Sequence, residues 1–138
     1  MDPLSIVAAS ASLIGAVGKT SVVVTEFIRG CRDARADLTA VSRELFELKL
    51  VLELLRDDTG TGLDDENLIP GAIHQQILSI LENCENILGH VNKVLDKHSG
   101  RTSPIRWTVF GKEEVVVLRT SLEAHRGALS LTLDTLNL

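Results

Sequence analysis

The stretch DLTAVSRELFELKLVLELLR, residues 37–56, decides the fold because its apolar residues recur at alternating steps of three and four. Such steps place the side chains on one face of an α-helix, as in a heptad pattern. We therefore expect a helix from about Asp33 to Arg56. Its inward stripe consists of Leu38, Val41, Leu45, Leu48, Leu52 and Leu55. The other faces carry Glu44, Glu47, Lys49, Glu53 and Arg56.

Helical patterns of similar length lie on both sides of this stretch. Asp2-Pro3 supplies an N-cap and a first helical residue, so we expect a first helix that ends near Arg29. A third helix should run from Pro70 to about His98, and a last helix from Lys112 to the end of the chain. The sequence therefore predicts at least four helices.

These patterns predict an all-α fold, an antiparallel bundle of four to five helices with short connections. We expect the acidic residues 57–67 and the residues 100–104 to be loops, because Gly and Pro interrupt the helical pattern there. Ile105–Phe110 should form a short helix or a helical turn. The expected core includes Leu45, Leu48, Leu52, Ile80, Leu88, Trp107, Leu118 and Leu122.

The composition agrees with one helical domain over residues 1–138. Hydrophobic residues make up 44% of the chain but aromatic residues only 3%, which favours helices packed through Leu, Ile, Val and Ala. A net charge of −5 and scattered basic residues argue against nucleic-acid binding. Cys31 and Cys84 lack the spacing of a zinc site and are typical of buried thiols in a reducing compartment, so we expect a cytoplasmic protein.

Several short motifs resemble catalytic or ligand sites but fail in detail. Gly18-Lys19-Thr20 is similar to the end of a phosphate-binding loop, but Leu13 stands where that loop needs glycine. His90 and His98 lie two turns apart on the third helix, too far for an i, i+4 metal pair. His125 lies on an apolar stripe, which favours a hydrogen-bonded core residue. We therefore expect no enzyme, no cofactor and no metal site.

The first helix is unusual because apolar residues cover nearly its whole circumference. Such a helix is either central in a bundle or inserted in lipid. Small residues four apart, as in Ala8-Ser12-Ala16, let another helix approach closely, also within a membrane. Lys19 and several serines interrupt the apolar stretch, which disfavours a constitutive transmembrane helix. Both interpretations of the helix stay open on the residues alone.

Four stretches together point to a family. They are MDPLSIVAASASLI (1–14), SREL (42–45), IRWTVFGKEE (105–114) and the closing helix Leu118–Leu133, which contains SLEAHR (121–126) and LSLTL (129–133). These stretches resemble the N-terminal HeLo-like domains of fungal NOD-like receptors of the STAND class. The resemblance spans essentially the entire chain, which makes it more specific than any single motif.

The resemblance implies an effector or signalling module that precedes nucleotide-binding and repeat regions. Related domains act in regulated cell death, heterokaryon incompatibility and innate immunity, where the domains oligomerise and an N-terminal helix or the bundle engages a membrane. The last helical pattern still runs at Leu138, so we expect a domain from a longer receptor. Its partners would be further copies of itself, anionic membrane lipid and the C-terminal receptor domains in cis.

Under this interpretation the first helix stays packed in a resting monomer and enters the plasma membrane after clustering. Several copies would then shelter Lys19 from hydrocarbon, because a charge within a membrane is costly unless it faces a pore or a partner. The residues expected to act in membrane contact or oligomerisation are Leu4, Ile6, Val7, Leu13, Ile14, Val17, Lys19 and Val24. Two alternatives remain: a non-lytic adaptor or self-association module, and a small-molecule or lipid carrier.

Overall fold

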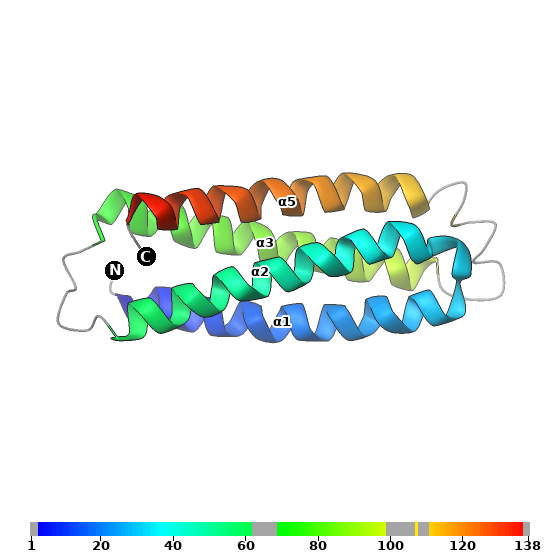
Figure 1. Ribbon diagram of the computed structural model, residues 1–138, viewed down its shortest axis with the longest axis horizontal. Coiled ribbons are helices and arrows are strands. Elements are labelled where there is room, and N and C mark those ends of the chain that lie inside the picture. The colour runs from blue at the N-terminus through cyan, green and yellow to red at the C-terminus, as the bar shows by residue number, and fades with distance from the viewer. Residues whose placement is uncertain (1–2, 62–68, 99–106, 108–110, 137–138) are drawn as a thin grey trace.

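Each long helical pattern forms one α-helix (Figure 1). The computed structural model describes residues 3–61, 69–98, 107 and 111–136. The helices are α1 (Pro3–Gly30), α2 (Arg35–Thr61), α3 (Gly71–Lys97) and α5 (Lys112–Thr135), with a 3₁₀ turn at Arg32–Ala34. These residues contain no strand, so the predicted all-helical class is confirmed for them. The short helix expected at Ile105–Phe110 lies outside the described residues, apart from Trp107.

Local backbone geometry explains where the helices begin and end. α1 stops at Gly30 because Cys31 is extended, with φ −144° and ψ 93°. We had expected Pro70 to be the first residue of α3. It is instead the N-cap residue just before the helix, with ψ 147°. α2 continues to Thr61, so the first acidic residues of the expected loop are helical. Gly60 disfavours a helix by only about 1 kcal/mol, which lets the last turn form.

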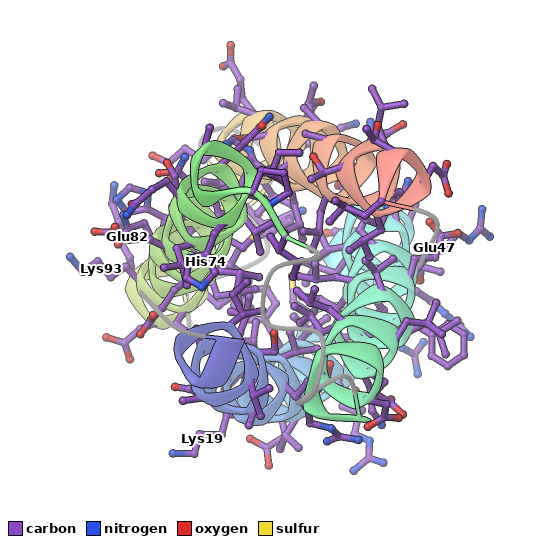
Figure 2. All side chains as sticks on the ribbon, turned by 90° about the vertical axis from the view of Figure 1, so that its left-hand side faces the viewer. Lys19, Glu47, His74, Glu82 and Lys93 are labelled. Atoms are coloured by element: carbon purple, nitrogen blue, oxygen red, sulfur yellow. The ribbon has the colours of Figure 1, made fainter. Side chains whose placement is uncertain are left out.

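The four helices form a bundle in which each helix packs against two neighbours. α1 packs against α2 and α3, and α5 packs against the same two helices on the other side of the core. Figure 1 shows that consecutive helices run in opposite directions, whereas the neighbours α1 and α3 run parallel, as do α2 and α5. α2 and α3 are therefore diagonal across the core (Figure 2). The heptad stripes predicted inward faces but not this choice of neighbours.

The core consists mainly of aliphatic side chains from all four helices. Each such side chain contributes about 1.5–3 kcal/mol when it is fully buried. Leu118, which we had expected in the core, is only partly buried at its edge. The other expected core residues are buried, namely Leu45, Leu48, Leu52, Ile80, Leu88, Trp107 and Leu122. The phenyl ring of Phe27 and the indole of Trp107, both buried, meet with their centroids 5.2 Å apart.

Candidate functional site

The residues that we expected to engage a membrane lie on α1, where some are buried and others are exposed. The buried ones, none more than 2% exposed, are Ile6, Leu13, Val17 and Val24. Val7 and Ile14 are partly buried, whereas Lys19 is exposed and points away from the bundle (Figure 2). Leu4 belongs to α1, but its side chain lies outside the described residues. The stripe of four buried residues is therefore hidden in this conformation, whereas Val22 and Val23 of the same helix are exposed.

The outward face of α1 is smooth and uncharged along its first half. Its exposed residues there are Ala8, Ala11, Ser12, Gly15 and Gly18. A Cβ atom added to Gly15 or Gly18 would meet nothing within 4 Å. By length and composition Ile6–Gly30 is able to cross a membrane, as are many core helices of soluble proteins. Of its most apolar 18-residue stretch, 28% is buried.

Few polar interactions between side chains hold α1 to the rest of the bundle. Asn92 of α3 donates a hydrogen bond of 3.2 Å to the hydroxyl of Thr20. The Oδ1 atom of Asn92 is buried without a hydrogen-bond partner among the described residues. Within the described ranges no ion pair joins α1 to another helix. α1 is therefore held chiefly by its apolar contacts.

α5, by contrast, is joined to α2 by a partly buried guanidinium. Nε of Arg126 lies 2.8 Å from Oε2 of Glu44, and Nη2 lies 3.2 Å from Oε2 of Glu47. The hydrogen bond to Glu44 raises the pKa of Arg126 above its usual value, although burial acts in the other direction. We had expected Glu44 on a solvated face, but it is buried. No sequence pattern indicates this pair, because its members are far apart in the chain.

Trp107 connects three helices at one end of the bundle. Its indole Nε1 donates a hydrogen bond of 3.3 Å to Asp37 of α2, and its ring contacts Phe27 of α1. The imidazole of His98 meets the indole edge-on, at a centroid distance of 6.3 Å. Gly111 lies against both rings, since a Cβ there would approach Trp107 to 2.6 Å. The close approach requires glycine at the start of α5.

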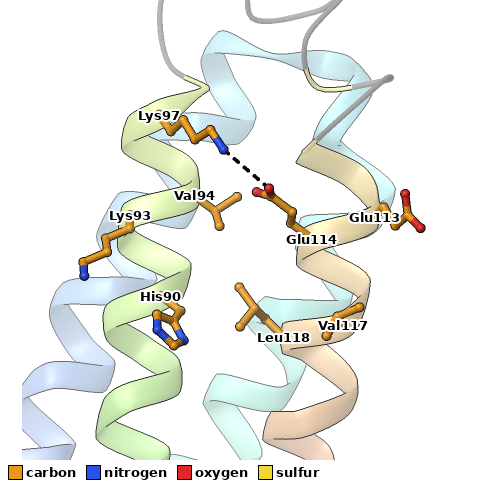
Figure 3. A pocket seen from close by; sticks show the side chains of 8 residues that line it. All are labelled: His90, Lys93, Val94, Lys97, Glu113, Glu114, Val117 and Leu118. Carbon is orange, nitrogen blue, oxygen red and sulfur yellow. Dashed lines mark ion pairs between the residues drawn. The ribbon is translucent and has the colours of Figure 1, made fainter.

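A groove of about 570 Å³ runs between α3 and α5 (Figure 3). Val94 and Leu118 form part of its apolar floor, with Lys93 on one wall and Glu113 on the other. Lys97 and Glu114 approach to 3.5 Å across its upper end (Figure 3). The side chains carry opposite charges on the two walls, so the groove has no net preference for anions or cations. We assign it no ligand.

The described residues contain no cluster of three or more His, Cys, Asp or Glu side chains that could hold a metal ion. Two surfaces of the described residues carry distinctive side chains, the outward faces of α1 and of α2. The second of these carries Phe46, Leu50 and Leu54, which are 60%, 48% and 55% exposed. We had not singled out these three residues, although counting the apolar residues outside the heptad stripe would have found them. No family model, curated protein or solved structure matches this chain.

Proposed function

We propose that this chain is an N-terminal effector or signalling domain of a fungal NOD-like receptor, which promotes regulated cell death by oligomerising and engaging a membrane through α1. The family part of the proposal rests on the sequence resemblance to HeLo-like domains. The observation that supports the mechanism is the surface of α1, an apolar helix whose outward face is small and uncharged from Ala8 to Gly18. The protein would be cytoplasmic at rest and reach the plasma membrane when active.

In the resting bundle, the core-facing stripe of α1, formed by Ile6, Leu13, Val17 and Val24, is kept away from water. The exposed residues from Ala8 to Gly18 are small, whereas Val22 and Val23 farther along the helix are 57% and 36% exposed. Released into lipid, the same side chains would contact hydrocarbon, and the small residues would let further copies of α1 approach closely. Lys19 and Glu26 would then face other copies instead of lipid.

The distribution of polar contacts favours α1 as the helix that leaves. Ion pairs join α5 to α2 through Arg126 and α5 to α3 through Lys97, so three helices share these links. Lys19 and Lys93 line one groove between α1 and α3 together with Glu85, so an anionic headgroup there would meet two cations and one carboxylate. Anionic lipid is therefore the membrane component that we propose as a partner.

The bundle determines which variants test this mechanism. Deleting residues 1–28, or placing Glu at Leu13 or Val17, would remove or charge part of the core and unfold the protein. The double substitution Gly15→Glu and Gly18→Glu instead changes an open surface, where an added Cβ atom meets nothing within 4 Å. Gly127→Glu, at an equally open position on α5, is the control. Circular dichroism would verify that all variants remain helical.

The assay is dye release from vesicles of phosphatidylcholine and phosphatidylserine, with the domain alone and fused to a trimerising coiled coil. We expect the clustered wild-type protein and Gly127→Glu to release dye, and the double Glu variant to release at least tenfold less. Equal release by the double variant would rule out insertion of α1. No release by the clustered wild-type protein would rule out membrane lysis.

The second candidate is a non-lytic adaptor that only binds other proteins. The exposed apolar residues on α2 favour it, because a solvated helix face rarely carries three large apolar side chains in one row. This candidate predicts association without dye release. The same vesicle assay, together with a measurement of oligomeric state, therefore separates the two functions.

A further inference from the structure

The outward face of α2 has a symmetric order of residues. Arg43, Phe46, Leu50, Leu54 and Asp57 follow one another at steps of three, four, four and three. At 3.6 residues per turn, these steps keep all five on one side of the helix. All five side chains are exposed. Leu50 is the centre of the row, with an apolar residue four positions away and a charged residue seven positions away in each direction.

The two ends of this row carry opposite charges. Reversing the helix end to end about Leu50 superposes Phe46 on Leu54 and Arg43 on Asp57. The face is thus complementary to itself in an antiparallel arrangement, which a two-fold axis generates. We propose that the α2 face binds the α2 face of a second copy, antiparallel, with the axis passing beside Leu50.

The charges favour this arrangement over a parallel one. In the antiparallel pair, Leu50 meets Leu50, and Arg43 of each copy lies opposite Asp57 of the other. Asp57 is exposed and lies 3.1 Å from Nε of Arg56 in its own chain, so Arg43 would share this carboxylate with Arg56. A parallel pair would place Arg43 against Arg43 and Asp57 against Asp57, which like-charge repulsion disfavours. Two carboxylates, Glu47 and Glu53, lie three positions from Leu50 on either side. Arg126 of the same chain lies 3.2 Å from the Glu47 carboxylate and offsets its charge, so Glu53 is the acidic residue that adds charge beside the row.

The expected dimer is weak. Three apolar side chains per copy make a contact below the size of standard stable interfaces. The dimer would also leave the outward face of α1 free, since that face is on a different helix. The inference therefore goes beyond the proposed function and does not depend on it: membrane activity is read by dye release, and this pairing by oligomeric state.

The first test is sedimentation of the wild-type protein over a concentration series from about 10 μM to 1 mM, the range for weak complexes. We expect a monomer–dimer equilibrium. Leu50→Glu places two carboxylates at the axis and should weaken dimerisation at least tenfold. Val117→Glu changes an exposed apolar residue of α5 and should leave it unchanged. A wild-type protein that remains monomeric throughout would overturn the proposal.

The second test exploits the two-fold symmetry. Arg43→Glu and Asp57→Arg should each weaken self-association, because like charges then meet at both ends of the dimer. Mixed in equal amounts, the two variants should form heterodimers, since both ends then pair opposite charges. The expected preference is at least tenfold over either homodimer, measured by sedimentation with one variant labelled. No preference, with wild-type dimers present, would overturn the antiparallel register.

Discussion

The guanidinium of Arg126 donates a 2.8 Å hydrogen bond from Nε to the carboxylate of Glu44, 82 positions earlier in the chain. The side chain of Glu44 is only 10% exposed, so its charge depends on this partner instead of water. Glu47 is the second carboxylate on the same guanidinium. These two ion pairs join the parallel helices α2 and α5 between their ends.

Removing the guanidinium should destabilise the bundle substantially. Arg126→Met leaves Glu44 as an uncompensated, nearly buried charge, and we expect the free energy of unfolding in urea to fall by about 3 kcal/mol. Arg119→Met is the control, because its pair with Glu123 is exposed and contributes at most about 0.5 kcal/mol. Adding Glu44→Leu to Arg126→Met should restore most of the loss. Equal effects of Arg126→Met and Arg119→Met would contradict this role.

Two glycine-to-alanine substitutions should act in opposite directions. At Gly111 the new methyl group would lie 2.6 Å from Cε3 of Trp107, so we expect a loss of about 1–3 kcal/mol. At Gly127 nothing lies within 4 Å, so Ala should stabilise α5 by about 0.5–1 kcal/mol. Thermal unfolding measures both effects. The fluorescence of Trp107, the one tryptophan, should change only in Gly111→Ala.

The Cys84 thiol should make the fold sensitive to alkaline pH. Burial raises the pKa of Cys84 from 9.0 to about 11. The folded state therefore holds the thiol proton to higher pH than the unfolded state does, and the associated stability is complete below pH 9 and lost as pH rises towards 11. The loss should reach about 2–3 kcal/mol. We expect the stability difference between wild type and Cys84→Ala to shrink by that amount between pH 8 and pH 11; a constant difference would contradict it.

The polar contact between α1 and α3 should weaken the packing of α1. Replacing both partners, as in Thr20→Val with Asn92→Leu, removes a hydrogen bond together with a buried Oδ1 atom that lacks a partner among the described residues. Such paired replacements are neutral or stabilising, here by about 1 kcal/mol. We expect slower hydrogen exchange of the α1 amides and, if α1 is the inserting helix, less dye release. Faster exchange would show that the contact holds α1 in place.

The heptad pattern of residues 37–56 was sufficient to predict α2 and its buried stripe, because apolar residues that recur with a period near 3.6 fall on one face of an α-helix. The same reasoning located α1, α3 and α5 to within a few residues. The contact of Trp107 with Asp37 was beyond reach, because a single side chain 70 positions away leaves no periodic signal. The pairing of α1 with α3 could not be predicted for a similar reason, since an apolar stripe does not indicate which helix packs against it.

For α1 itself, the sequence alone determined that the helix is apolar on almost all sides and left open which side faces the core. Only the tertiary structure decided this: the larger Ile6, Leu13, Val17 and Val24 are buried, and the small Ala8, Gly15 and Gly18 face solvent. The physical reason is area, because burying large aliphatic side chains removes more apolar surface from water than burying glycine or alanine. The sequence thus determined the helices. Which face of each helix is buried in the shared core, and which face stays exposed to a partner, was decided by the packing of the helices against one another.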